Sequence, residues 1–435
     1  MNSLNYVITP GSHVEGICHV PGDKSISHRA IILSAIAQGV TQVDGFLDGL
    51  DCLATLNAFK NMGVKFEGPI NNKVIIHGVG LKGLTKPTEP IYLGNSGTSI
   101  RLLAGLLAGQ NFDSVLVGDE SLMSRPMERV ITPLTQMGAK IEGAKHGCAP
   151  LSIKGNQSLH GIDYVLPVAS AQVKSCILLA GLYANNETKV TEHGITRDHT
   201  ERMLTAFSYP IKKADHSVSV HGGGELTGID MVVPSDISSA AFFMVAATIC
   251  PNSSLLIKNV GINPTRTGVI NILQLMGANI KLVNKRVCGD EPVADISVKH
   301  AVLEGIEIPM EFVSLAIDEF PVIFIAAAAA KGCTVLKGAK ELRVKESDRI
   351  ASMVDGLLTL GIDAEALDDG AIIHGGVIQG GVVDSFGDHR VAMAFSMAGL
   401  VAQKDITVTG CKNVQTSFPN FVSISAQLGI AIVEK

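Results

Sequence analysis

The stretch PGDKSISHRAIILSAIAQG, residues 21–39, decides the fold of this chain. Its Pro-Gly pair favours a turn, and the apolar run at residues 30–37 predicts a buried helix that the final glycine ends. The first amide groups of a helix have no partner within the helix and carry a partial positive charge. Lys24, Ser25 and Arg29 lie at this helix start. Together they predict a binding site for a phosphate or carboxylate group.

The same pattern, in which a polar or small residue starts a strongly apolar helix, occurs six times along the chain. The starts are 71, 74, 65, 83 and 70 residues apart. Such a period is longer than that of solenoid repeats and fits an α/β unit with two helices and several strands. We therefore expect six related units, which start at Ser25, Ser96, Ser170, Ser235, Asp318 and Asp388.

A glycine between two apolar residues follows at matching phase in five of these units. We interpret it as the left-handed end of an amphipathic helix, after which a short strand begins. The third unit has Tyr209-Pro210 in this place. Five such turns in phase indicate internal duplication. They are Met62-Gly63-Val64, Met137-Gly138-Ala139, Met276-Gly277-Ala278, Leu360-Gly361-Ile362 and Leu428-Gly429-Ile430.

The 435 residues are too many for one ordinary core, and six repeats divide evenly into two domains of three. The break falls near the fourth helix. The first twenty residues precede the first repeat and alternate as a strand does, so we expect them to pair with the C-terminal half. The predicted domains are residues 21–239 and a discontinuous C-terminal domain of residues 1–20 and 240–435.

Composition narrows the class of partner. The net charge of −6 argues against nucleic acid as the main partner. The eight cysteines are scattered, with no Cys-x-x-Cys pair and no zinc-ligand spacing, so we expect reduced thiols and no metal site. Hydrophobic residues make up 46% of the chain, which is enough for large cores.

The chain shows no signal for a membrane or for export. Its first residues lack a basic segment followed by an apolar one, so we expect no signal peptide. The longest apolar runs, such as residues 320–330, are too short to cross a bilayer. We expect a cytoplasmic protein, and a monomer, because no amphipathic stretch stands out as a partner surface.

Cations at the helix starts point to anionic ligands. Capping alone explains an isolated Ser or Asp at such a position. Lys24 and Arg390 need a further explanation. A cation at the positive end of a helix is unfavourable unless an anion lies between the cation and the helix end. The charged segment 341–350 has two interpretations. It forms a solvated face, or Lys345 and Arg349, one helical turn apart, share a face that binds an anion.

Other chemistries have little support in the sequence. The pair Asp198-His199 could serve a hydrolase only together with a nucleophile. The sequence has no serine in a nucleophile elbow and no cysteine that pairs with this histidine, so hydrolase chemistry has little support. The segment HGGG at residues 221–224 has no Gly-x-Ser-x-Gly companion, so we interpret it as a turn. The chain has no Walker lysine motif and no Gly-x-Gly-x-x-Gly after a strand, which leaves nucleotide use unsupported.

Five motifs in consistent order, from about residue 16 to the end, resemble the signatures of one family. That family is the 3-phosphoshikimate 1-carboxyvinyltransferases, or EPSP synthases, and the resemblance is to the bacterial branch with Ser-Ala-Gln at the third helix start. The motifs are PGDKSISHR at 21–29, LGNSGT at 93–98 with Arg101, RVKESDR at 343–349, GDHR at 387–390 and TSFP at 416–419.

The resemblance implies a two-domain, inside-out α/β fold of six βαβαββ-type repeats, three in each domain, with helices inside and sheets outside. It places six helix N-termini at a cleft between the domains, where the active site lies. The implied reaction transfers the enolpyruvyl group of phosphoenolpyruvate to the 5-hydroxyl of shikimate 3-phosphate and releases phosphate. It needs no metal and no organic cofactor.

The resemblance also implies roles for residues at matching motif positions. Asp318 and Glu346 would transfer protons, with Lys24 nearby, since the reaction needs a base for the 5-hydroxyl and an acid for the methylene carbon. Shikimate 3-phosphate would be held by Lys24, Ser25, Arg29, Ser170, Gln172, Arg197, Asp318 and Lys345. Phosphoenolpyruvate would be held by Lys24, Gly97, Arg125, Gln172, Arg349 and Arg390.

Three positions depart from the plant and enteric branch of the family. Ala171 replaces a second serine, Arg197 replaces a smaller hydroxyl residue, and Thr416 replaces a lysine that contacts phosphoenolpyruvate. These choices are similar to the other bacterial branch, some members of which resist glyphosate. Gly97 keeps the small residue at the position that faces the inhibitor, so sensitivity to glyphosate stays open.

Two alternatives remain. UDP-N-acetylglucosamine enolpyruvyl transferase shares the fold, but it has Asn after the first lysine and a reactive cysteine in the loop before the Arg-Pro pair. Here Ser25 follows Lys24, and residues 118–124 contain no cysteine. The second alternative is a non-catalytic anion-binding protein, which would be expected to lose Asp318 or Glu346.

Overall fold

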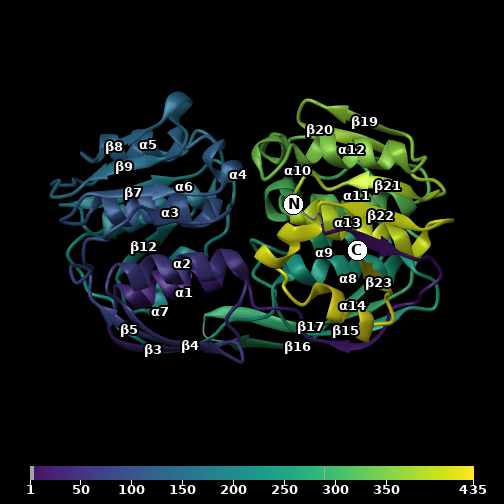
Figure 1. The fold of residues 1–435 in the computed structure, drawn as a ribbon, viewed down its shortest axis with the longest axis horizontal. Coiled ribbons are helices and arrows are strands. Elements are labelled where there is room, and N and C mark those ends of the chain that lie inside the picture. The colour runs from purple at the N-terminus through teal and green to yellow at the C-terminus, as the bar shows by residue number, and fades with distance from the viewer. Residues whose placement is uncertain (1–3, 289) are drawn as a thin grey trace. The chain divides into compact units, whose positions relative to one another are not determined.

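The computed structural model describes residues 4–288 and 290–435, which form two compact units. The central unit is Lys24–Val233, and the terminal unit combines Met1–Asp23 with Pro234–Lys435 (Figure 1). Each unit has an apolar core of its own. The chain therefore passes between the units twice, after Asp23 and after Val233.

The described residues of the central unit form three four-stranded sheets, each from one repeat. In each sheet the two leading strands are parallel and the others antiparallel, as the second sheet, β6-β7-β9-β8, illustrates. The first repeat takes its leading strand, β14, from the end of the unit.

Its elements in repeat order are β14 (Asp230–Val232), α1 (Lys24–Ala35), β3 (Gln38–Asp44), α2 (Leu50–Asn61), β4 (Lys65–Ile70) and β5 (Lys73–Val79); β6 (Ile91–Tyr92), α3 (Gly97–Ala108), β7 (Ser114–Val117), α4 (Glu120–Met123), α5 (Glu128–Gln136), β8 (Lys140–Gly143), the 3₁₀ turn η1 (Lys145–Gly147) and β9 (Leu151–Lys154); β10 (Asp163–Val165), α6 (Ala171–Gly181), β11 (Glu187–Thr191), α7 (His199–Ala206), β12 (Ile211–Ala214) and β13 (Ser217–His221).

The terminal unit repeats this design, and the start of the chain contributes to two of its sheets. Strand β2 lies parallel to β15, and β1 lies antiparallel between β22 and β23. The middle sheet has three strands among the described residues, because short bridges at Glu304 and Glu307 take the place of a leading strand.

Its elements are β2 (Glu15–Cys18), α8 (Ile237–Ile249), β15 (Ser254–Gly261), α9 (Gly268–Leu275), β16 (Asn279–Cys288) and β17 (Glu291–Lys299); α10 (Met310–Val313), η2 (Ser314–Ala316), α11 (Phe320–Ala329), β18 (Cys333–Leu336), η3 (Lys340–Val344), α12 (Arg349–Thr359), β19 (Ala364–Leu367) and β20 (Gly370–His374); β21 (Gly381–Asp384), α13 (His389–Ala398), η4 (Gly399–Val401), β22 (Ile406–Thr409), η5 (Cys411–Thr416), α14 (Phe421–Gln427), β23 (Ile432–Glu434) and β1 (Tyr6–Ile8).

The inner helices are apolar on every side, which explains why the sheets lie outside them. All residues of α8 are buried, and α11, with the sequence FPVIFIAAAA, is buried except at its last residue. A helix of this kind needs cover all round. Helices α8, α11 and α13 pack on one another, and α3 packs on α1 and α6. The sheets supply the remaining cover, as where α3 packs on β7 and β9.

A left-handed residue ends the second helix of every repeat. The five predicted glycines have φ between +80° and +99°. In the second repeat, Gly138 N donates to Thr135 O at 3.0 Å and Ala139 N to Leu134 O at 3.0 Å. This pair of bonds is the Schellman motif. The five glycines are Gly63, Gly138, Gly277, Gly361 and Gly429.

The third repeat makes the same turn without glycine. Ser208 takes the left-handed conformation, with φ of +63°, and Tyr209 N donates to Leu204 O at 2.8 Å. The sequence interpretation placed this slot at Tyr209-Pro210, which is one residue too late, because a serine in the left-handed region is uncommon and leaves no glycine signal.

Three of the expected helix starts are shifted by one or two residues. Helix α1 begins at Lys24, so the expected start Ser25 is already its second residue. Helix α8 begins at Ile237 with Asp236 as its cap, rather than at Ser235. Helix α11 begins at Phe320 with Glu319 as its N-cap residue, rather than at Asp318. At both α8 and α11, an acidic residue that follows the expected start takes the N-cap position. Within the described part of the chain, no helix combines the length and apolar character needed to cross a membrane.

Candidate active site

In the central unit, Arg29 ties three helix starts together. Its Nε donates to Thr200 Oγ1 at 2.7 Å, and its Nη2 donates to Ser175 Oγ at 2.8 Å. Its Nη1 donates to Ser25 O at 3.0 Å. These bonds fix the guanidinium between α1, α6 and α7. They hold a buried positive charge at the end of the helices where anions are favoured.

A chain of hydroxyl groups joins the starts of α1, α2 and α3. His28 Nδ1 lies 2.8 Å from Thr55 Oγ1, and Thr55 Oγ1 lies 2.6 Å from Ser99 Oγ. Ser99 Oγ in turn donates to Ser96 Oγ at 2.7 Å, and Ser96 caps α3 by accepting from Ser99 N. All four side chains are buried, so their polar groups hold the three helices in register.

Gln172 links the first turns of α3 and α6. Its Oε1 accepts from Arg101 Nη1 at 2.7 Å, and its Nε2 donates to Thr98 Oγ1 at 3.0 Å. Gly97 is the first residue of the same helix, α3. A Cβ at Gly97 would lie 2.9 Å from Arg101 Nη1 and 3.0 Å from Arg125 Nη1. The absence of a side chain at this position is what lets two guanidinium groups gather at the start of α3.

Arg125 is oriented by neutral groups. Its Nη2 donates to Asn95 Oδ1 at 2.5 Å and to Ser121 Oγ at 3.1 Å. Its side chain is 6% exposed, and among the described residues its Nε has no hydrogen-bond partner. An arginine held in this way keeps its charge available for a carboxylate or phosphate.

Lys24 has a partner that the motifs did not indicate. Its Nζ lies 2.5 Å from Oδ2 of Asp51, which is in the first turn of α2. The two side chains are 16% and 6% exposed. The sequence carries no signal for this pair, because only the packing of α1 on α2 brings the residues together.

A buried ion cluster supports the segment that carries Arg197. Lys174, four residues after the cap Ser170, has its Nζ 2.9 Å from Glu192 Oε1 and 2.7 Å from Glu201 Oε1. Burial lowers the pKa of Lys174, but the two glutamates outweigh it and raise that pKa. The lysine stays charged and ties residues 192–201 to the start of α6.

In the terminal unit, the predicted carboxylates and cations form one cluster. Asp318 Oδ1 lies 3.4 Å from Lys345 Nζ and 3.4 Å from Arg349 Nη1. Arg349 Nη2 also donates to Glu346 Oε2 at 2.6 Å. The two residues expected to transfer protons are therefore joined through one guanidinium. Asp318 lies just before α11 and Glu346 just before α12, the two helices that Figure 1 labels.

Arg349 and Arg390 are held by the start of α13. Asp388 caps α13 by accepting from Arg390 N at 2.9 Å, and it accepts from Arg349 Nε at 2.8 Å. Arg390 Nη1 donates to Asp318 O at 3.0 Å. Burial would lower the pKa of Arg349, but Asp388 and Glu346 outweigh it and raise the pKa above its ordinary value.

The expectation that Lys345 and Arg349 share a helix face is wrong. The 3₁₀ turn η3 ends at Val344, and α12 begins only at Arg349. The cause is Asp348, whose Oδ1 accepts from Ala351 N at 3.0 Å and so caps α12 at that point. Asp318, rather than helical spacing, brings the lysine and the arginine together.

The predicted site residues divide into two sets, one in each unit. The terminal set is Asp318, Lys345, Glu346, Arg349 and Arg390. The central set, at the starts of α1, α3 and α6 and in adjoining loops, is Lys24, Ser25, Arg29, Gly97, Arg125, Ser170, Gln172 and Arg197. Sequence reasoning missed Asp51, Arg101 and Asp388 as site residues, although the last two lie inside the quoted motifs.

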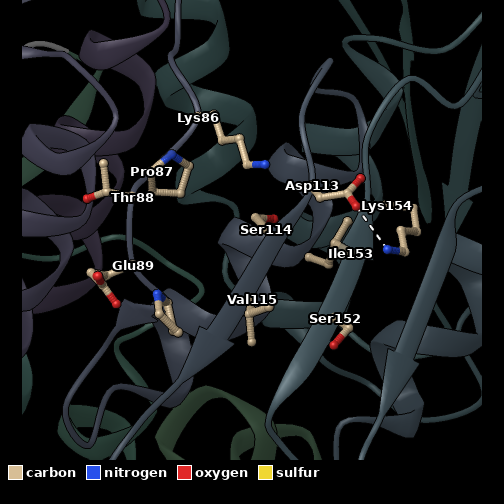
Figure 2. A pocket seen from close by; sticks show the side chains of 11 residues that line it. Lys86, Pro87, Thr88, Glu89, Asp113, Ser114, Val115, Ser152, Ile153 and Lys154 are labelled. Atoms are coloured by element: carbon tan, nitrogen blue, oxygen red, sulfur yellow. Dashed lines mark hydrogen bonds and ion pairs between the residues drawn. The ribbon is translucent and has the colours of Figure 1, made fainter.

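A separate hollow of about 300 Å³ lies elsewhere on the central unit (Figure 2). It is lined by residues 86–90, 113–115 and 152–154. Lys154 Nζ and Asp113 Oδ2 pair across part of it at 2.9 Å. None of the predicted site residues lines this hollow, so we assign it no part in anion binding or proton transfer.

Comparison with known families gives a match over most of the chain. The profile of the family described as EPSP synthase (3-phosphoshikimate 1-carboxyvinyltransferase) matches residues 8–424. A 3-phosphoshikimate 1-carboxyvinyltransferase from Legionella pneumophila (strain Lens) is 58% identical over 431 residues, which is 99% of both chains. The enzyme of that name from Methylococcus capsulatus is 58% identical over 434 residues, again 99% of both chains.

Solved structures agree with these sequences. An EPSP synthase from Acinetobacter baumannii matches with a TM-score of 0.89 and 54% identity, covering 99% of this chain and 100% of that one. The enolpyruvyl transferase NikO from Streptomyces tendae matches with a TM-score of 0.80 at 15% identity, over 100% and 99% of the two chains. The second match supports the fold alone. The expected α/β fold of the enolpyruvyl transferases is confirmed.

Proposed function

This chain belongs to the EPSP synthase family, and from that premise we propose how its residues share the reaction. The enzyme transfers the enolpyruvyl group of phosphoenolpyruvate to the 5-hydroxyl of shikimate 3-phosphate and releases phosphate. The product, 5-enolpyruvylshikimate 3-phosphate, leads to chorismate and the aromatic amino acids. The full-length match to enzymes of this name is the observation that carries the activity.

We propose that both residue sets act on the same pair of substrates. Lys24, Ser25, Arg29, Ser170, Gln172, Arg197, Asp318 and Lys345 bind shikimate 3-phosphate. Lys24, Gly97, Arg125, Gln172, Arg349 and Arg390 bind phosphoenolpyruvate. The support is the gathering of cations at helix starts, where backbone amides and the helix dipole also favour anions.

Asp318 and Glu346 move the protons of the reaction. In the addition step a proton reaches the methylene carbon of phosphoenolpyruvate, and the 5-hydroxyl oxygen bonds to the adjacent carbon as it loses its own proton. In the elimination step the bond to the phosphate oxygen breaks and the new methyl group gives a proton back. Asp318 and Glu346 both contact Arg349, so each carboxylate stays close to a fixed cation. This arrangement is suited to the proton transfers of the two steps.

The arginines stabilise the tetrahedral intermediate. Its carboxylate and its departing phosphate both carry negative charge, so fixed guanidinium groups lower the energy of the states that lead into and out of it. Arg125, Arg349 and Arg390 supply this charge. Nothing in the proposed steps calls for a metal or an organic cofactor, and we propose that the enzyme works as a cytoplasmic monomer on small molecules.

The test is phosphate release from phosphoenolpyruvate by the purified protein in EDTA. We expect release with shikimate 3-phosphate and none with UDP-N-acetylglucosamine, the acceptor of the related transferase. Phosphate release with UDP-N-acetylglucosamine alone would overturn the assigned acceptor. No phosphate release with either acceptor would favour a non-catalytic anion-binding protein. Size-exclusion chromatography with light scattering checks the monomer.

The division of proton transfer has its own test. Asp318→Asn and Glu346→Gln remove one carboxylate each while keeping its shape. In deuterated water the methylene group of phosphoenolpyruvate gains deuterium only if the methyl group forms and reverts. A variant that loses this exchange together with turnover has lost transfer to carbon. If kcat of a variant stays at the wild-type value, the substituted carboxylate has no part in proton transfer.

A further inference from the structure

Arg266, which lies in the terminal unit between β15 and α9, is buried against acidic groups outside the proposed binding sets. Its side chain is 2% exposed. Its Nη1 donates to Asp23 Oδ2 at 3.1 Å, and its Nη2 lies 3.3 Å from Asp236 Oδ1. The same Nη2 donates to Ser238 Oγ at 2.7 Å. The guanidinium therefore joins two carboxylates that are far apart in the sequence.

These two carboxylates mark the places where the chain leaves and re-enters the terminal unit. Residues 21–23 and 234–236 lie side by side: Asp23 N donates to Pro234 O at 2.8 Å, and Asp236 N donates to Pro21 O at 2.8 Å. Arg266 binds one carboxylate on each segment. It thus joins the two segments through which the chain crosses between the units. The first of these segments immediately precedes Lys24 in the sequence.

The same guanidinium also reaches the start of α11. Its Nη2 lies 3.6 Å from Glu319 Oε1, the oxygen that also accepts from Ser238 Oγ. The Glu319 side chain is fully buried and follows Asp318 directly. Arg390 Nη1 lies 3.8 Å from this oxygen and 3.0 Å from the Asp318 carbonyl. Arg390 thereby holds the Asp318 carbonyl directly, and both guanidinium groups lie against the side chain of the next residue, Glu319.

Such a cluster is costly to bury. Desolvation of several charged groups opposes folding, and a buried ion cluster is often no more stable than apolar packing of the same shape. Removal of the central cation would leave three buried carboxylates facing one another. A gain in stability therefore does not explain the arrangement, whereas a fixed geometry at the start of α11 does.

We propose that Arg266 is a positioning residue for the enolpyruvyl transfer: through Glu319 it sets the place of Asp318, and through Asp23 and Asp236 it fixes the two crossings that lead to and from the central unit. The inference rests on the proton-transfer role proposed for Asp318. It assigns to Arg266 no contact with either substrate.

The test compares Arg266→Lys and Arg266→Gln with a control in the same unit that removes the partly exposed cation of another buried carboxylate. The control is Lys258→Met, since Lys258 pairs with the buried carboxylate of Asp295. We expect kcat to fall about tenfold in Arg266→Lys and about a hundredfold in Arg266→Gln, with KM for either substrate within about threefold of wild type. The control should lose stability to urea and keep kcat within about twofold.

Glu319→Gln supplies a second variant, which removes one charge without changing the shape of the side chain. If Arg266 acts through Glu319, the double variant Arg266→Lys, Glu319→Gln should be no more than about twofold slower than the slower single variant. Losses that multiply would overturn the proposal, and so would a folded Arg266→Lys or Glu319→Gln enzyme with wild-type kcat. If Arg266→Lys does not fold, the kcat of Glu319→Gln alone decides.

The wild-type assay separates this inference from the assigned activity. A wild-type protein that releases no phosphate with shikimate 3-phosphate refutes the activity itself. Wild-type turnover that survives in Asp318→Asn refutes the role of Asp318. Wild-type turnover that needs Asp318 but not Arg266 refutes only the positioning role.

Discussion

Arg349 holds Asp388 through two hydrogen bonds, from Nε to Oδ2 at 2.8 Å and from Nη2 to Oδ1 at 3.3 Å. The two side chains are 1% and 0% exposed. Asp388 also caps α13, the helix that carries Arg390 in its first turn. One buried carboxylate therefore orients both of the cations that we assign to phosphoenolpyruvate in the terminal unit.

Asp388→Asn tests this dependence. The amide keeps the shape but leaves Arg349 without its buried counter-charge, so we expect the free energy of unfolding to fall by about 3 kcal/mol. Urea unfolding followed by circular dichroism measures it. The control is Asp348→Asn, a cap on α12 whose side chain is 36% exposed. It should cost less than about 1 kcal/mol, because asparagine caps a helix as well as aspartate does and the lost pair with Arg343 is partly exposed. Equal losses in the two variants would contradict the argument.

Gly97→Ala tests the space at the start of α3. The new methyl group would meet Arg101 Nη1 at 2.9 Å and Arg125 Nη1 at 3.0 Å, so the guanidinium groups must move. We expect KM for phosphoenolpyruvate to rise about tenfold, because a displaced cation binds the ligand less well. Stability should hold, since alanine favours the helix.

The control for that substitution is Gly376→Ala, where an added Cβ meets Ile362 Cδ1 at an ordinary 3.5 Å. Steady-state kinetics with each substrate varied in turn decide the matter. A larger rise in KM for shikimate 3-phosphate than for phosphoenolpyruvate would show that Gly97 serves the other ligand.

Lys174→Met should weaken binding of shikimate 3-phosphate rather than slow the chemistry. Without the ammonium group, the carboxylates of Glu192 and Glu201 repel each other and release the segment that carries Arg197. We expect a loss of stability of about 3 kcal/mol and a severalfold rise in KM for shikimate 3-phosphate, with kcat nearly unchanged. Lys189→Met, which removes an exposed pair with Asp163, should do neither. A fall in kcat without a change in KM would refute this reasoning.

The parts of the fold that could be predicted from sequence are those set by local rules. A glycine between apolar residues marks a left-handed helix end because few other residues adopt that conformation, and all five predicted glycines adopt it. The left-handed conformation of Ser208 was not predicted, because this residue makes the same turn without glycine. The starts of α8 and α11 were displaced for a similar reason, since two neighbouring residues could each cap the helix.

The site was predictable only where its residues stand in motifs. Gln172 and Arg101 each lie in a quoted segment, but their contact depends on α3 packing against α6. The same holds for Lys24 and Asp51, which no spacing connects. Helical periodicity also misled, because Asp348 starts α12 too late for Lys345 to belong to it. Partners across repeats are set by tertiary packing, which a single sequence does not display.

Asp236→Asn should change how stability depends on pH. Burial, together with the nearby Asp23 carboxylate, raises the pKa of Asp236 from 3.8 to about 6. The folded state therefore binds this proton more tightly than the unfolded state does. Wild-type stability gains from the group below about pH 4 and loses that gain as pH rises to about 6.

Asparagine does not titrate, so the wild-type minus variant free energy of unfolding should fall, on the order of 2 kcal/mol, across this window and level off above it. Urea titrations at half-unit pH steps measure the difference; a value that is flat or rises between pH 4 and 6 would mean that Asp236 is ionised throughout and that Arg266 dominates its surroundings.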